Sequence, residues 1–290
     1  MHAYLRSIGF SNLRSMRDLN RLIADTVNHY DEKQLFESND GRMMAEISRD
    51  AGPGFGLRVC GEYDNENRFY AEYLFPYLYG ERISSMEEIM IERHVATDSY
   101  LLAVDDLRVG ATLICYLQNM ADYRIHALRG DYPEGRLPVY LSAFSREGTI
   151  LLPLQKDDET GYEESQSERT SLIRAAMDGD EEAIEKVTIE DFDTYSMLME
   201  RVGKEDVLTI VDSYFMPDGS ECDCYSVLGT ILNCESVVNS LTREPLRRMV
   251  VECNGIPITI CMHADDLIGE PEAGRRFRGR IWLQGYVEFS

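Results

Sequence analysis

The sequence predicts an α+β fold with a β-rich N-terminal domain, an acidic helical connector and a small antiparallel C-terminal barrel. Short strand patterns separated by Gly, Asn and Asp turns dominate both ends of the chain, and an acidic stretch with helical periodicity lies between them. The length of 290 residues suggests about two domains. The expected boundaries are 1–155 for the N-terminal domain, 156–204 for the connector and 205–290 for the barrel.

The N-terminal domain is expected to combine one helix with several strands. A strand-like run at 3–10 precedes a helix at about 15–30, for which Ser15 is a plausible N-cap. Further strands are expected at 42–48, 55–63, 68–79, 100–104 and 111–117. A hairpin should follow, with strands at 138–144 and 149–154 around a turn at Arg146, Glu147 and Gly148.

The connector is marked by a sharp change in charge. Between Lys156 and Asp193 there are fourteen acidic and four basic side chains, a net charge of −10. Residues 156–168 lack apolar periodicity and are expected to form an exposed linker, after which the pattern becomes helical. Acidic residues in the first turn stabilise a helix through its dipole, so a structural role explains much of this charge.

The last segment is again rich in strand patterns. Strands are expected at 207–215, 225–234, 248–253, 256–263 and 280–289. Asn254-Gly255 between two apolar runs predicts a tight hairpin, because both central positions of a type I′ turn require positive φ. Five short strands favour a small barrel of the oligonucleotide/oligosaccharide-binding (OB) type.

Charge and cysteine usage limit the partners and the compartment. The formal net charge of −23 opposes binding to nucleic acids and to anionic membranes, which requires basic residues. The seven cysteines are odd in number and follow no secretory signal, which fits a reducing cytoplasm. The longest apolar run, 109–117, is too short to span a membrane. We therefore expect a cytoplasmic protein with no membrane association.

Four residues form a candidate zinc site: Cys222, Cys224, Cys261 and His263. Each pair is separated by one residue, so on a strand both members of a pair would point the same way. Zinc takes four Cys or His ligands in structural sites. The alternative is that these thiols are buried in the core, where free Cys is common. No cofactor is expected.

A basic stripe is the candidate contact for a ligand or partner. Arg276, Arg278, Arg280 and Trp282 alternate with smaller or apolar residues, so a strand would place them on one face. Such a face could bind a small anionic ligand or a protein partner. The alternative is ion pairing with neighbouring strands, since the chain is rich in Asp and Glu.

The sequence contains no recognisable catalytic motif. It lacks a Gly-x-Ser-x-Gly elbow, a His-Glu-x-x-His helix and a dinucleotide-binding glycine pattern, and it has only five His. A non-catalytic binding or regulatory protein is the favoured function. The alternative is a hydrolase or transferase that combines scattered carboxylates with His263.

Several stretches together resemble one bacterial family. They are MHAYLRSIGFS at 1–11, GDEEAIE at 179–185, DFDTYSM at 191–197, DSYFMP at 212–217, ECD at 221–223, GEPEAGRRF at 269–277 and IWLQG at 281–285. The chain resembles an uncharacterised family of clostridial Firmicutes, known as a domain of unknown function. The resemblance implies a cytoplasmic bacterial protein and brings no activity and no catalytic residues.

Overall fold

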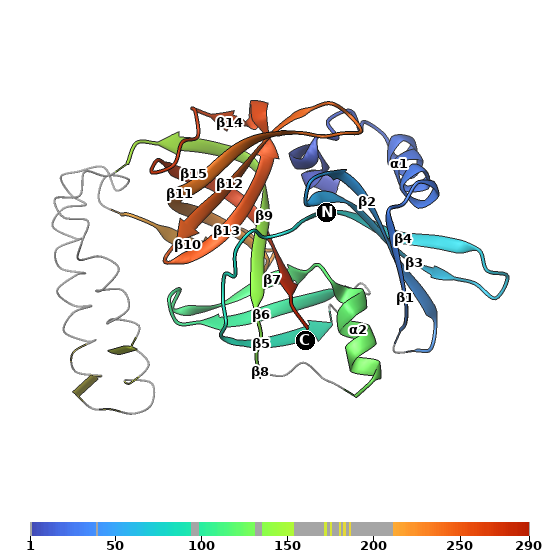
Figure 1. Ribbon diagram of the computed structural model, residues 1–290, viewed down its shortest axis with the longest axis horizontal. Helices are drawn as coiled ribbons and strands as arrows, with labels where there is room; N and C mark the ends of the chain where they lie inside the picture. Colours follow the sequence, from blue (N-terminus) through green and yellow to red (C-terminus); the bar gives the residue numbers. More distant parts are fainter. Residues whose placement is uncertain are drawn as a thin grey trace.

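The computed structural model describes most of the chain outside the acidic connector. The described residues are 2–38, 40–93, 99–130, 135–153 and 211–289, together with Ser171, Leu172, Ala175, Asp180, Glu182, Ala183 and Lys186. Apart from those seven residues, the predicted connector, 156–204, lies outside the described part, as do residues 207–210 of the predicted strand 207–215. In the described remainder of that range the strand begins only at Tyr214. The described part is β-rich and consists of two sheets with helices packed on them (Figure 1).

The first sheet has four antiparallel strands in chain order. They are β1 (Glu32–Glu37), β2 (Met43–Gly52), β3 (Phe55–Tyr63) and β4 (Phe69–Leu78). Helix α1 (Met16–Asn28) packs against β2 and β3. The predicted strands at 42–48, 55–63 and 68–79 are confirmed, whereas β1 was not predicted.

Helix α1 begins where its sequence predicts. The Ser15 hydroxyl accepts a hydrogen bond from the Asp18 amide at 3.2 Å, which satisfies one of the free N–H groups of the first turn. Leu19 and Thr26 are the buried residues of the helix. Side chains seven positions apart lie on one face of a helix, so this face holds α1 on the sheet.

The second sheet contains the remaining strands. They are β5 (Glu88–Arg93), β6 (Tyr100–Asp106), β7 (Ala111–Leu117), β8 (Gly135–Arg136), β9 (Val139–Leu151), β10 (Tyr214–Pro217), β11 (Cys224–Val238), β12 (Pro245–Cys253), β13 (Ile256–His263), β14 (Leu267–Ile268) and β15 (Arg276–Val287). Their order is β10-β11-β12-β13-β9-β15-β7-β6-β5-β8, with β14 beside β9. Helix α2 (Met120–Leu128) follows β7 and contacts β1.

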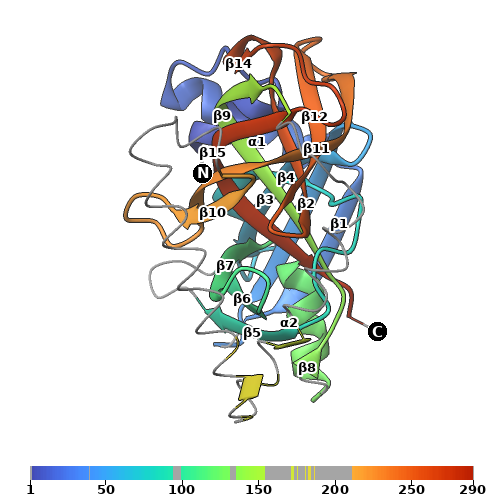
Figure 2. The ribbon, with the colours of Figure 1, turned by 90° about the vertical axis from the view of Figure 1, so that its left-hand side faces the viewer.

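Five of these strands close into a barrel. Strand β11 pairs with β12 along one part of its length and with β15 along another, which joins the ends of the series β11-β12-β13-β9-β15. The barrel takes β9 from the first half of the chain, and β9 runs parallel to β13, where the sequence predicts an antiparallel barrel. Strands β9 and β15 extend beyond the barrel toward β7, so both parts of the sheet share them (Figure 2).

Two local predictions are wrong. The expected hairpin at 138–154 is the single strand β9, because β15 pairs with it along its whole length and Arg146 is accommodated as a bulge. The expected strand at 3–10 is the 3-10 helix η1 (His2–Ile8). Leu5 and Ile8 are three residues apart, so a 3-10 helix buries both on one side.

Other C-terminal predictions are confirmed. Strand β13 has the predicted bounds, and β11, β12 and β15 contain or overlap the predicted ranges. Asn254 and Gly255 have φ values of 52° and 75°, as a type I′ hairpin requires. Within the described part of the chain, no helix has the length and apolar character needed to cross a membrane.

Gly229 is required where β11 passes from β12 to β15. A Cβ there would overlap the Glu252 carbonyl oxygen and the Cys253 sulfur. We expect Gly229→Ala to lower the free energy of unfolding by about 1–3 kcal/mol, because the strand must shift. Urea unfolding followed by the fluorescence of Trp282 measures this, with Ser226→Ala on the same strand as a control. Equal midpoints for the two variants would contradict the tight closure.

Candidate functional site

The first predicted zinc pair does not join the second. Cys222 is exposed, and the Cys224 sulfur lies 3.4 Å from a carboxylate oxygen of Glu221 and 3.8 Å from the hydroxyl of Tyr4. Among the described residues, one group of three His, Cys, Asp or Glu side chains places its ligand atoms within 4.8 Å of one another. That group is Glu221, Asp223 and Cys224, which shares only Cys224 with the predicted set.

The second predicted pair is buried on β13. The Cys261 thiol donates to the carbonyl oxygen of Ser7 at 3.4 Å. The His263 ring accepts from the Asp265 amide at 3.2 Å, and its other nitrogen lies 3.4 Å from a carboxylate oxygen of Glu244. The Cys261 contact joins β13 to η1, and the His263 contacts join the end of β13 to the residue before β12 and to the turn that follows β13. The structure does not bring the four predicted ligands together.

The basic stripe divides into buried and exposed members. Arg276 is buried, and its guanidinium donates to the carbonyl oxygens of Leu152 and Val211, both at 3.1 Å. Trp282 is also buried, and its indole N–H donates to Asp223 at 2.7 Å. Neither side chain is available to a partner at the surface.

Arg278 and Arg280 are the exposed members of the stripe. Arg280 lies 3.2 Å from Asp218 and 3.6 Å from Glu147, which fits the alternative of pairing with neighbouring strands. Such exposed ion pairs contribute little to stability.

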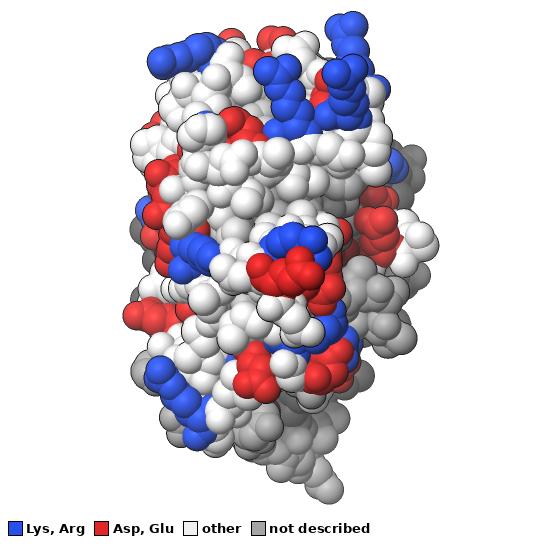
Figure 3. All heavy atoms as spheres, turned by 90° about the vertical axis from the view of Figure 1, so that its right-hand side faces the viewer, with Lys and Arg blue, Asp and Glu red and all other residues white. Residues whose placement is uncertain are grey.

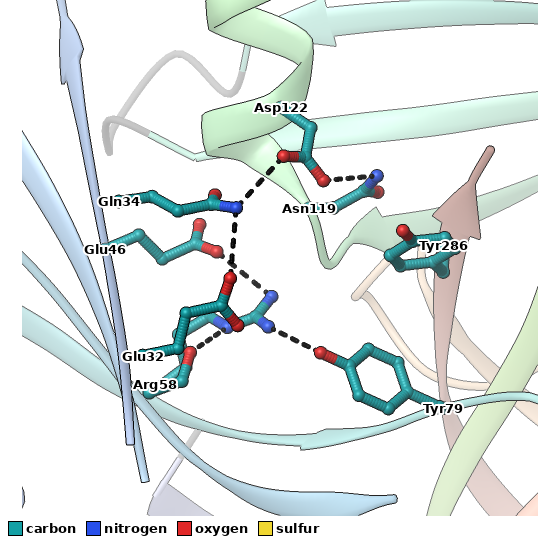
Figure 4. A pocket seen from close by; sticks show the side chains of 9 residues that line it. Glu32, Gln34, Glu46, Arg58, Tyr79, Asn119, Asp122 and Tyr286 are labelled. Carbon is teal, nitrogen blue, oxygen red and sulfur yellow. Dashed lines mark hydrogen bonds and ion pairs between the residues drawn. The ribbon is translucent and has the colours of Figure 1, made fainter. Parts of the chain in front are cut away.

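A polar cavity of about 90 Å³ lies between the four-stranded sheet, the start of α2 and the end of β15 (Figure 4). Its lining residues come from both sheets and are mostly polar: Glu32, Gln34, Glu46, Ser48, Arg58, Tyr79, Asn119, Asp122 and Tyr286. The outer face that includes the four-stranded sheet carries interspersed acidic and basic side chains among uncharged areas, with no broad patch of one sign (Figure 3). The cavity is therefore the stronger candidate site.

A buried ion pair forms the inner wall of the cavity. Glu46 and Arg58 are each about 4% exposed, and their charged groups are 3.1 Å apart. The Arg58 guanidinium also donates to Ser48 at 2.9 Å, to the Gln118 carbonyl oxygen at 2.6 Å and to Tyr79 at 3.2 Å. These bonds satisfy Arg58 and fix it in place.

Glu46 is less completely satisfied than Arg58. Its Oε2 atom is buried and makes no hydrogen bond of normal geometry with any described residue. The pKa of Glu46 is raised to about 7, chiefly by burial; Arg58 and the Ala121 amide at the start of α2 lower it, and Asp122 adds to the rise. This carboxyl group therefore changes charge near neutral pH.

Two further carboxylates line the cavity: Glu32 lies beside Glu46 on the sheet side, and Asp122 lies opposite on α2 (Figure 4). The Gln34 side-chain amide donates to Glu32 at 3.3 Å and to Asp122 at 3.2 Å, and Asn119 donates to the other oxygen of Asp122 at 3.3 Å. These amides orient both carboxylates without neutralising them. The cavity thus combines three carboxylates with one guanidinium.

The sequence analysis missed this site, although a signal was present. Glu46 and Arg58 are single charged residues within otherwise buried, largely apolar runs on β2 and β3. The register pairs Ser48 with Arg58 and Glu46 with Cys60, so Glu46 and Arg58 lie on the same face of the sheet. A charged residue at the centre of a buried strand usually has a partner, and two such residues on successive strands could have been paired.

One comparison with known proteins gives a match. The model of a family described as "Domain of unknown function, E. rectale Gene description (DUF3881)" matches residues 5–285. No curated protein and no solved structure matches the chain.

The difference between the buried and the exposed arginines of the basic stripe can be tested by measuring the free energy of unfolding of two variants. We expect Arg276→Ala to lower the free energy of unfolding by about 1–3 kcal/mol, because two carbonyl groups lose their donor. Arg278→Ala should stay within about 0.5 kcal/mol of wild type, since Arg278 is exposed. Urea titration of both variants measures the difference, and equal effects would contradict the buried role of Arg276.

The raised pKa of Glu46 predicts a specific pH dependence of stability. Between its ordinary value of 4.5 and about 7, the folded protein binds more protons than the unfolded chain. The stability from this group is fully present below pH 4.5 and is lost as the pH rises through about 7. The free energy of unfolding of Glu46→Gln, relative to that of wild type, should therefore rise by up to about 3 kcal/mol between about pH 4.5 and pH 8.

Asp106→Asn is the matched control for this measurement. Asp106 is also buried, but hydrogen bonds from Arg108 and Ser85 outweigh the effect of burial and hold its pKa below the ordinary value. The difference in free energy of unfolding between Asp106→Asn and wild type should not change with pH above about pH 4.5. A flat difference for Glu46→Gln over the same range would show that Glu46 is already ionised.

Proposed function

We propose, for a chain that belongs to this family of unknown function, a non-catalytic role as a binding protein that holds a small ligand in the cavity beside Glu46. The single observation that carries the proposal is the buried Oε2 atom of this carboxyl group, to which no described residue donates a hydrogen bond of normal geometry. A buried polar atom without a partner costs about 1–3 kcal/mol, and a ligand that donates to it would remove that cost. An unpaired polar atom at the wall of a cavity is thus the feature expected of a binding site.

The walls of the cavity favour binding without large rearrangement. Glu46 and Arg58 project from paired strands, and Asp122 projects from the first turn of α2. Rigid elements with fixed side chains lose little entropy when a ligand binds. The volume of about 90 Å³ corresponds to roughly three water molecules, so the site suits a small compound or one end of a larger one.

A hydrolase or transferase is the second candidate, and the pKa of Glu46 near 7 favours it. A carboxyl group with such a pKa can donate and accept protons at neutral pH. In this reading Glu46 takes the role that the sequence analysis gave to His263. The binding role requires only the unpaired oxygen and the fixed walls, and it remains the preferred proposal.

We also propose a barrel type, domain boundaries and a location for the protein. The closed barrel is consistent with an OB-type barrel whose strand order is altered by the early position of β9. The boundaries at 155 and 204, and a cytoplasmic location, are likewise proposed. We also propose the exposed Arg278 and Arg280 as a second contact surface, for an anionic ligand or a protein partner.

Binding can be tested with a fragment library that contains amines, amidines, alcohols, amides and carboxylates. Ligand-observed NMR should find fragments that bind wild type and Asp106→Asn but not Glu46→Gln, because only the last variant changes the cavity. Trp282 fluorescence verifies that each variant is folded. Fragments that bind all three proteins equally, or no binding by wild type at millimolar concentrations, would refute the site.

A further inference from the structure

We infer that the ligand of the Glu46 cavity is an organic cation with a guanidinium group. This inference rests on the proposed function and adds the chemical class of the ligand. It follows from the acceptors that the cavity offers, from its charge and from the spacing of its carboxylates.

The cavity offers more hydrogen-bond acceptors than donors. The Arg58 guanidinium already donates to Glu46, Ser48, Gln118 and Tyr79. The free Oε2 atom of Glu46 is an acceptor, and a carboxylate oxygen can accept more than one hydrogen bond. A ligand that fits this surface must donate hydrogen bonds, which disfavours anions.

The charge of the cavity favours a cation. Arg58 offsets the charge of Glu46, which leaves Glu32 and Asp122. Among the described residues, neither of these two forms an ion pair with Lys or Arg, and both share the neutral side chain of Gln34. Three carboxylates and one guanidinium give a net charge of −2 when Glu46 is ionised.

The spacing of the carboxylates argues against a single metal ion. A metal ion needs its ligand atoms around one point. Glu32, Glu46 and Asp122 do not form a group with oxygens within 4.8 Å of one another; in the described chain that criterion is met only at Glu221, Asp223 and Cys224. An ammonium nitrogen has the same requirement, because acceptors ~2.9 Å from one atom lie close together.

A guanidinium group meets the wider spacing. Its five N–H donors are spread over three nitrogens in one plane, so they can reach separate acceptors, and two of them can pair with one carboxylate. The close view shows Glu32 and Glu46 on the sheet side and Asp122 opposite on α2 (Figure 4). A planar cation between them would contact both walls.

Ionisation of Glu46 should be coupled to binding. The charged groups around it are Arg58 on β3, Glu32 on β1 and Asp122 on α2. The titratable groups that also interact with it are Cys60, Tyr73 and Tyr116. A cation that binds beside Glu46 favours its charged form and releases a proton, so affinity should rise with pH through about 7. An uncharged ligand would not show this increase.

Calorimetric titration with methylguanidinium and methylurea tests the class, because the two are nearly the same size and differ in charge. At about pH 8, wild type and Asp106→Asn should bind methylguanidinium at least about tenfold more tightly than methylurea, a difference of about 1.4 kcal/mol. The preference should fall about tenfold at about pH 6. In Glu46→Gln the preference should be smaller than in wild type at about pH 8 and should not change between the two pH values.

Other outcomes would overturn the inference. Equal affinity for methylurea, or tighter binding of methylammonium or Mg²⁺, would exclude the guanidinium class. If other fragments bind in a Glu46-dependent manner and methylguanidinium does not, the class is wrong and the binding site stands. If nothing binds in that manner, both proposals fail. A blocked arginine amide that binds more tightly than methylguanidinium would identify the source as a polypeptide side chain, and weaker binding would identify a small molecule.

Discussion

The buried guanidinium of Arg58 is the interaction on which the arrangement of the two sheets depends. It projects from β3 in the first sheet and donates to the carbonyl oxygen of Gln118, which lies between β7 and α2 in the second. Its bonds to Ser48 and Tyr79 fix its position within the first sheet. Removing the partner of a buried charge costs several kcal/mol, so the relative placement of the sheets and the pairing of this side chain are coupled.

Two glutamine side chains continue this polar seam between the sheets. Gln118 donates to the Leu78 carbonyl oxygen at the end of β4 and to Ser142 on β9, and Gln284 of β15 donates to the carbonyl oxygen of Pro76. Apolar contacts alone tolerate sliding, whereas hydrogen bonds of fixed direction specify one relative position. The seam thus explains how a cavity can persist between the sheets without collapse.

Local elements were predictable from the sequence, but the site was not. Alternation and the Asn254-Gly255 turn identify β13 with its correct bounds, because both signals act over a few residues. The bulge at Arg146 reads as a turn in isolation and becomes part of a strand only through pairing with β15. Barrel closure by β9 and the meeting of Glu46 with Asp122 depend on long-range contacts, which no local pattern encodes.

The unpaired polar atoms show where the fold has given up stability. Of the four buried side-chain atoms that lack a hydrogen bond in the described residues, three belong to Glu46, Gln118 and Gln284, and the fourth to Thr26. The first three line the seam between the sheets, and folded proteins contain few such atoms. Since sequences violate the rule of satisfied polar groups mainly at functional sites, their concentration at one interface favours a role for that interface beyond stability. The exposed arginines Arg278 and Arg280 carry no comparable cost, because water satisfies them, and so give no such indication.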